Sequence, residues 1–187
     1  YNIPAVQALQ FVGLDGLLEM ATRLGVESLA HPELHCPEYP YDQPPAYGLA
    51  LTLGGGEVRL LEMTAAFAAF ANGGMRFRPS PILRIEDAAG NVLVDNSAPM
   101  GQAVISPQHA YLITSILSDT RARCRAFRCP SPLELSRPAA AKSGTTNDYR
   151  DGWTVGYTPD LVAGVWVGNS DNSPTDGLDG SAGAGPI

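Results

Sequence analysis

The stretch Lys142–Thr146, of sequence KSGTT, contains the single lysine of a 187-residue chain whose other strongly basic residues are all arginines. It places one ammonium group beside the hydroxyl groups of Ser143, Thr145 and Thr146. A lysine ammonium can hold charge or take part in proton transfer, and hydroxyl groups can donate hydrogen bonds to an anion. A lysine on an edge strand can also serve only to prevent aggregation. The surrounding elements decide between these two interpretations.

Three strands are predicted in the last part of the chain, and KSGTT ends the first of them. The apolar residues before Lys142 predict a strand over 139–146, and two later runs predict strands over 152–157 and 161–169. The segments between the strands are rich in Asn, Asp and Pro, which is typical of tight turns. We therefore expect an antiparallel meander.

Helices are predicted before these strands. Apolar residues recur at helical spacing in four segments, 3–12, 14–24, 57–71 and 107–119. Ser106 is the expected N-cap of the fourth, with Pro107 at the first helical position. Its apolar residues predict one buried stripe, made of Leu112, Ile113, Ile116 and Leu117.

The remaining segments predict a hairpin and two loops. In residues 81–96, apolar residues alternate with others on both sides of a turn at 89–91, and this pattern predicts the hairpin. Residues 30–56 are rich in Pro and Gly and predict a long ordered loop. The glycine-rich segment 176–186 predicts a plain loop rather than a calcium site, because the spacing of its aspartates fits no EF-hand.

Composition excludes some functions. The net charge of −7 argues against nucleic acid as a partner, and the arginines between 121 and 128 are interpreted as a solvated helix end and loop. No apolar run is long enough to cross a membrane. Cys124 and Cys129 are consistent with a local disulfide or, together with Cys36, with three inert thiols. No cluster with metal-ligand spacing is present, so no metal site is expected.

Longer segments resemble one family. Lys-Ser/Thr-Gly-Thr is the third motif of the penicillin-binding proteins and serine β-lactamases. The stretch KSGTTNDYRDGWTVGYTPDLVAGVWVGN is similar to strands of the class A, bifunctional penicillin-binding proteins. GGGEVRLLEMTAAFAAFANGG and the ending GSAGAGPI resemble other parts of the same domain. CPSPLELSRPAAAKSGTT suggests the branch that includes penicillin-binding protein 1C.

The resemblance implies an α/β (α+β) fold of the β-lactamase/transpeptidase type, with helices flanking an antiparallel sheet. The fold is expected to be incomplete, because residues 1–187 resemble only the C-terminal part of a single penicillin-binding transpeptidase domain. The family nucleophile lies in Ser-x-x-Lys, and no such motif occurs in this sequence. We therefore expect this chain alone to be inactive, and a docked remainder of the domain to supply the serine.

The resemblance assigns catalytic roles to Lys142, Asn2 and Thr145. Lys142 would hold positive charge over the cleft and tune proton transfer. Asn2 would be the last residue of the second motif, Ser-x-Asn, although it is also a plausible N-cap for the helix that follows. The backbone N–H of Thr145 would supply half of an oxyanion hole.

The same resemblance assigns substrate binding to Ser143, Gly144, Thr145 and Thr146. The hydroxyls of Ser143 and Thr145 would bind the substrate carboxylate, and Gly144 would let the substrate backbone approach the strand. Trp153 and Trp166 are interpreted as packing residues. The sequence Ser170–Asn172 spells Ser-Asp-Asn but is assigned no catalytic role, because the family has a surface turn there.

The implied function is that of a peptidoglycan D,D-transpeptidase, which cross-links cell wall through an acyl-serine and is the target of β-lactams. Its partners would be the D-alanyl-D-alanine stem peptide and β-lactams, with no cofactor. The parent protein would be membrane-anchored and would act on the outer face of the cytoplasmic membrane. The alternative is a non-catalytic β-lactam-sensing or scaffold module of the same fold.

Overall fold

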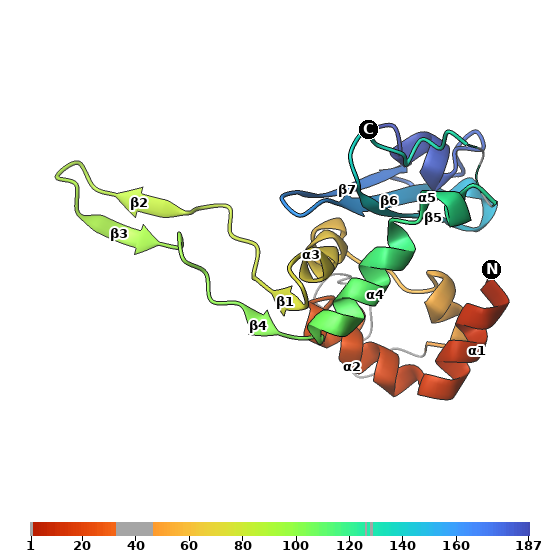
Figure 1. Ribbon diagram of the computed structural model, residues 1–187, viewed down its shortest axis with the longest axis horizontal. Helices are drawn as coiled ribbons and strands as arrows, with labels where there is room; N and C mark the ends of the chain where they lie inside the picture. Colours follow the sequence, from red (N-terminus) through yellow and green to blue (C-terminus); the bar gives the residue numbers. More distant parts are fainter. Residues whose placement is uncertain (1, 33–46, 126, 128) are drawn as a thin grey trace.

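The computed structural model describes residues 2–32, 47–125, 127 and 129–187. Tyr1, Cys36 and Arg128, on which parts of the sequence analysis depend, lie outside these ranges. Within them, the helices and strands form a mixed helical and antiparallel-sheet fold (Figure 1). The predicted fold class is confirmed.

A three-stranded antiparallel sheet positions the KSGTT stretch. Its strands are β5 (Ala140–Thr145), β6 (Asp151–Tyr157) and β7 (Val162–Gly168), paired in the order β5-β6-β7. The predicted meander is therefore confirmed. Because β6 is central, β5 keeps one open edge within the described part of the chain.

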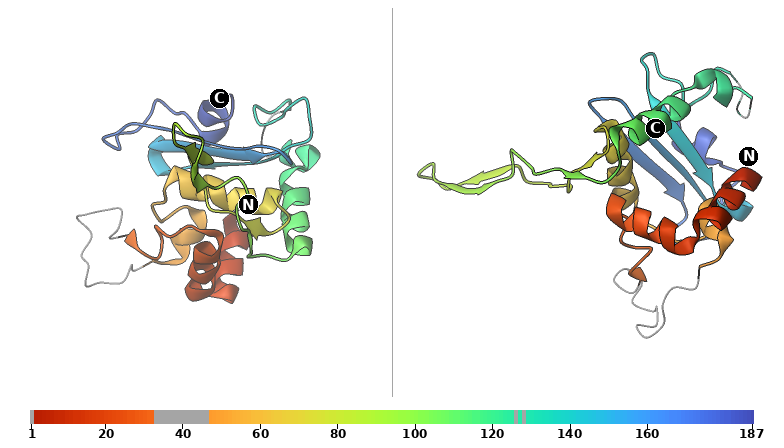
Figure 2. Two further views of the ribbon diagram at one scale, coloured as in Figure 1. Left: turned by 90° about the vertical axis from the view of Figure 1, so that its left-hand side faces the viewer. Right: turned by 60° about the horizontal axis from the view of Figure 1, so that its bottom comes forward.

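The sheet is packed on both faces. The helices α3 (Leu60–Ala71) and α4 (Pro107–Leu117) lie against one face, and the short helical turn η4 (Gly180–Ala184) lies against the other. Figure 2 shows α1 (Asn2–Val12) and α2 (Leu14–Leu24) as a further layer beyond α3 and α4. The sheet is thus the middle layer between two sets of helical elements.

Two helix boundaries lie where the sequence predicts them, whereas α3 begins at Leu60 rather than at Glu57 and α4 ends at Leu117 rather than at Asp119. Gly25 adopts the left-handed conformation with φ of 96° and closes α2 through hydrogen bonds to Ala21 O and Thr22 O. Ser106 caps α4 by accepting a hydrogen bond from the His109 backbone N–H at 3.3 Å. Capping residues read from the sequence therefore set these boundaries.

A small hydrophobic core holds the helices together. Ala21, Val26, Leu29, Leu51 and Ala66 form its buried centre. The side chain of Tyr157 connects α3 and α4 to the sheet, since its ring packs edge-on against Phe67 and its hydroxyl hydrogen-bonds Thr114 Oγ1 at 2.9 Å. Burial raises the pKa of the Tyr157 phenol.

The predicted hairpin projects away from the rest of the molecule (Figure 1). It is made of β2 (Arg84–Glu86) and β3 (Val92–Asp95), and every residue of both strands is exposed. A second short pair, β1 (Met75–Arg76) with β4 (Gln102–Ala103), joins the hairpin to the body. This second pair was not predicted from the sequence.

The predicted burial on α4 is wrong, and part of the predicted loop is helical. The stripe predicted on α4 is not buried, because Leu112, Ile113 and Ile116 are 55%, 36% and 68% exposed and the helix contacts its neighbours through Ala110 and Thr114 instead. Of the predicted loop 30–56, residues 33–46 lie outside the described ranges, and the described part after them contains a 3₁₀ helix, η2 (Leu49–Leu53), whose Leu51 joins the core. Helical periodicity identifies an apolar face but does not show whether another element covers it.

The tail and the arginine-rich segment also differ from expectation. The tail expected as a plain loop contains η4. Cys124 and Cys129 form a disulfide after α5 (Thr120–Arg123), which favours one of the two interpretations left open. Arg123 is not simply solvated, because its guanidinium donates to the backbone carbonyls of Leu117 and Leu133.

Candidate active site

The KSGTT stretch runs along the open edge of the sheet. Lys142, Ser143, Gly144 and Thr145 pair with Val155, Thr154, Trp153 and Gly152 of β6, in that order. Because side chains alternate along a strand, Lys142 points to one face of the sheet while Ser143 and Thr145 point to the other. The strand therefore offers an ammonium on one face and two hydroxyls on the opposite face.

Lys142 is the cation of this edge. Its Nζ donates a hydrogen bond to the backbone carbonyl of Ser143, and the residue is exposed to solvent. Desolvation by the neighbouring protein nevertheless lowers the pKa of the ammonium. No acidic side chain forms an ion pair with it in the described part of the chain. This arrangement leaves a positive charge available to an anion at the strand edge.

The threonines that follow are held by different partners. Thr145 Oγ1 accepts a hydrogen bond from the Gly180 N–H at 3.0 Å, so it is tied to η4. Thr146 Oγ1 accepts from the Asp151 N–H at 2.9 Å and closes the connection between β5 and β6. Thr146 therefore stabilises the turn, whereas Thr145 lies on the face that carries Ser143.

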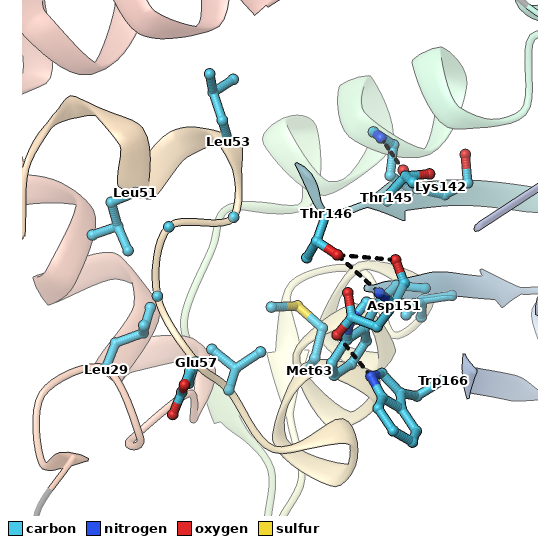
Figure 3. Close-up of a pocket in the computed structure, with 18 of the residues that line it drawn as sticks. Leu29, Leu51, Leu53, Glu57, Met63, Lys142, Thr145, Thr146, Asp151 and Trp166 are labelled. Carbon is cyan, nitrogen blue, oxygen red and sulfur yellow. Dashed lines mark hydrogen bonds between the residues drawn. The ribbon is translucent and has the colours of Figure 1, made fainter. Parts of the chain in front are cut away.

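A cavity of about 700 Å³ adjoins the strand. The five residues of KSGTT contribute to its wall, as do Asp151, Trp153 and Trp166 of the same sheet. Figure 3 shows Leu29, Leu51 and Leu53 on the opposite side. The volume lies within the range of small-molecule sites, and the wall is mostly apolar with a few polar groups, as such sites usually are.

Asp151 is a site residue that sequence reasoning missed. Its Oδ2 accepts hydrogen bonds from the indole N–H groups of Trp166 at 2.8 Å and Trp153 at 3.2 Å (Figure 3). Its Oδ1 is buried and has no hydrogen-bond partner within the described residues. The spacing Asp-x-Trp could have indicated the contact with Trp153, but the contact with Trp166 depends on strand pairing.

The tryptophans therefore do more than pack within the sheet. They pair across β6 and β7, and both line the cavity beside KSGTT. The carboxylate of Asp151 fixes the edges of both rings. Trp166 remains 39% exposed, so the expectation of packing alone is incomplete for this residue.

The other candidates do not line this cavity. Asn2 is the first residue of α1, is exposed, and is not among the described residues that line the cavity. It lies within the helix rather than before it, so the N-cap interpretation is wrong. Ser170, Asp171 and Asn172 form an exposed turn after β7, as expected for a sequence without a catalytic role.

The described residues contain no group of three or more His, Cys, Asp or Glu side chains that could hold a metal ion. Among the helices in the same ranges, none combines the length and apolar character needed to cross a bilayer.

Comparison with known proteins identifies the family. Residues 2–186 match the penicillin binding protein transpeptidase domain. The chain is 33% identical over 183 residues to penicillin-binding protein 2D of Bacillus subtilis, covering 95% of this chain and 24% of that protein. It is 33% identical over 170 residues to penicillin-binding protein 1A of Aquifex aeolicus, covering 89% of this chain and 20% of that protein. The chain belongs to the penicillin-binding protein transpeptidase domain family.

Solved structures confirm the fold. The penicillin-binding protein PonA1 of Mycobacterium tuberculosis superposes with a TM-score of 0.70 at 28% identity, over 89% of this chain and 45% of that one. Penicillin-binding protein 1A of Haemophilus influenzae superposes with a TM-score of 0.71 at 25% identity, over 97% of this chain and 31% of that one. The chain spans only about a fifth to a quarter of the length of the two relatives compared by sequence. Its relation to the penicillin-binding protein 1C branch stays a prediction.

Proposed function

We propose that this chain is the C-terminal part of a peptidoglycan D,D-transpeptidase domain that uses an acyl-serine and is a β-lactam target. The observation that carries the proposal is the placement of Lys142, Ser143 and Thr145 along an open sheet edge beside a cavity. The two hydroxyls, on one face of this edge, suit the carboxylate end of a peptide, and the ammonium adds positive charge from the other face. PonA1 of Mycobacterium tuberculosis, a structural relative, has been solved in complex with penicillin V.

The backbone of β5 fits the role of an oxyanion donor. The N–H of Thr146 donates to Asp151 O and so points toward β6. Backbone groups alternate in direction along a strand, which places the N–H of Thr145 on the open edge. A donor there can stabilise the negative oxygen that forms when an acyl carbon is attacked.

Gly144 supports the same interpretation. A Cβ added to it would meet only Trp153 Cβ, at 3.6 Å, and would otherwise stand free at the edge. The absence of a side chain leaves the backbone open to an extended peptide that pairs with β5 as an added strand. The stem peptide would bind in this way, with its terminal carboxylate at Ser143 and Thr145.

Other parts of the domain complete the chemistry in this proposal. The sequence contains no Ser-x-x-Lys, so the nucleophile has to come from the remainder of the domain. Asn2 would act with the serine of the second motif. The parent protein would be membrane-anchored and would work outside the cytoplasm, on the periplasmic or cell-wall side. We call this chain joined to its upstream transpeptidase sequence the complete domain.

Labelling with fluorescent penicillin tests the proposal. The complete domain should form a covalent adduct that survives denaturing electrophoresis, and this chain alone should not. Unlabelled penicillin added first should abolish the band. If the complete domain binds penicillin reversibly but forms no adduct, the chain belongs instead to a non-catalytic β-lactam-sensing or scaffold module, and the proposal is wrong.

A further inference from the structure

Gly180 packs directly on the backbone of the KSGTT strand. A Cβ placed on it would lie 2.1 Å from Gly144 O and 2.4 Å from Trp153 O. From the other side, a Cβ on Gly152 would lie 3.0 Å from the Gly180 Cα. Contacts below 3.0 Å with backbone atoms cannot be relieved by a side-chain rotation. Glycine is therefore the only residue that fits at position 180 with the turn in this place.

Two hydrogen bonds fix Gly180 to adjacent strands. Its N–H donates to Thr145 Oγ1 on β5 at 3.0 Å. Its carbonyl accepts from Thr154 Oγ1 on β6 at 2.6 Å. Thr154 is buried, and its side chain points to the same face of the sheet as Thr145. The peptide groups of Gly180 thus connect the two strands across this face.

The turn that carries Gly180 is ordered by its own cap. Asp179 Oδ1 accepts hydrogen bonds from the backbone N–H groups of Ser181 at 2.7 Å and Ala182 at 2.8 Å, and from the Ser181 hydroxyl at 2.6 Å. These bonds, led by that of the Ser181 side chain, lower the pKa of the carboxyl group. The position of Gly180 is therefore held by both the sheet and the turn.

The bond from Gly180 determines what the Thr145 hydroxyl can still do. A hydroxyl group has one hydrogen to donate and two lone pairs. One lone pair of Thr145 Oγ1 accepts from Gly180, and within the described residues its hydrogen is donated to no other group. An oxygen that already accepts from an amide is polarised to donate more strongly.

We infer that Gly180 is a positioning residue that sets Thr145 as a hydrogen-bond donor for the carboxylate of the substrate or β-lactam. This inference deepens the proposed function and rests on it. It adds Thr154 and Asp179 to the determinants of carboxylate binding, although neither has to touch the ligand. The ligand group that Gly180 serves is an anionic carboxylate rather than the reacting carbonyl.

Two versions of one β-lactam separate positioning from a general structural role. In the complete domain, the second-order acylation rate is measured with penicillin and with its methyl ester, which lacks the anionic carboxylate. Gly180→Ala should slow acylation by penicillin at least about tenfold and change the already slow ester reaction less than about twofold. Gly48→Ala is the control, because a Cβ there meets nothing within 4 Å, and it should leave both rates unchanged.

A gentler variant covers the case in which Gly180→Ala does not fold. Thr154→Val keeps the shape of the strand residue but removes the donor to Gly180 O, and it should reduce the preference for penicillin over the ester by about threefold or more. Equal slowing of both compounds in the variants, or no slowing, overturns the inference. If the parent domain itself shows no preference for the free carboxylate, the proposed role of Ser143 and Thr145 fails instead.

Discussion

The sheet β5–β7 and the hairpin β2–β3 are both antiparallel, but they are held in different ways. The sheet is covered by α3 and α4 on one face and by η4 on the other, and backbone groups of Gly180 bond to two of its strands. Within the described part of the chain, β2 and β3 pair only with each other, and neither has a buried residue. Its turn is fixed locally, by three hydrogen bonds to the carboxylate of Asp87.

The difference indicates where chemistry can be carried out in this molecule. A site that binds a carboxylate needs donors held to within a fraction of an ångström. β5 meets this condition because elements pack on both of its faces, whereas neither strand of the hairpin contributes a residue to the cavity. The same type of secondary structure therefore serves as a rigid frame in one place and as an exposed projection in the other.

Removing the cation of the rigid strand should have the largest effect. In the complete domain, Lys142→Ala is expected to lower the second-order acylation rate by about 100-fold to 1,000-fold, the typical loss for one electrostatic contact in an active site. The melting temperature should change little. Lys142→Arg should also fail, because a broad guanidinium does not replace a compact ammonium. Acylation of Lys142→Ala at the parent rate would show that the lysine is only a surface residue.

The pH dependence of acylation should report the same cation. Desolvation lowers the pKa of Lys142 from 10.5, so the ammonium is lost at a lower pH than in an exposed lysine. The acylation rate should fall as the pH rises through this lowered value. Relative to the unfolded chain, folding favours the neutral amine, so this deprotonation does not itself destabilise the fold. Acylation rates measured in short incubations at increasing pH, starting from neutrality, test this prediction. A rate that stays constant up to pH 10.5 would contradict it.

The same substitution in the two regions should sharpen the contrast between them. Val155 on β6 is 4% exposed and Val92 on β3 is 47% exposed. Val155→Ala should lower the free energy of unfolding by about 2 kcal/mol, because it leaves a void in a packed face. Val92→Ala should change it by less than about 0.5 kcal/mol. Denaturant unfolding of the complete domain measures both, and equal losses would mean that the hairpin is covered in solution.

A smaller effect is expected where α4 joins the sheet. Tyr157→Phe removes the hydroxyl that bonds Thr114 Oγ1 and should cost about 1 kcal/mol of unfolding free energy. Tyr149→Phe, at a residue that is 49% exposed, is the matched control and should be neutral. Acylation should be unchanged in both variants. A large loss of acylation in Tyr157→Phe would place α4 within the active site.

Much of the fold could be predicted from the sequence because its signals are local. Pro107 and Ser106 mark the start of α4, Gly25 marks the end of α2, and alternation marks each strand of the meander. Burial of the α4 stripe could not be predicted in the same way. An apolar face shows that a helix can be covered, and only the arrangement of the other elements shows whether it is.

Only the part of the candidate site that is contiguous in the sequence could be predicted. KSGTT and its position at a strand edge follow from contiguous residues. Asp151 binds Trp166 through strand pairing, and Gly180 meets Thr145 from 35 residues away in a tail that sequence reasoning interpreted as a plain loop. Such contacts leave no periodic or spacing signal, because they depend on how the tail folds back over the sheet.

The most direct test of the central claim is a crystal structure of the complete domain acylated by penicillin. We expect the carboxylate of the drug to lie within about 3.2 Å of Ser143 Oγ and Thr145 Oγ1, with the N–H of Thr145 directed at the former β-lactam carbonyl oxygen. The Gly180 N–H should keep its hydrogen bond to Thr145. A carboxylate bound elsewhere, with β5 unoccupied, would contradict the assignment of this strand as the substrate-binding edge.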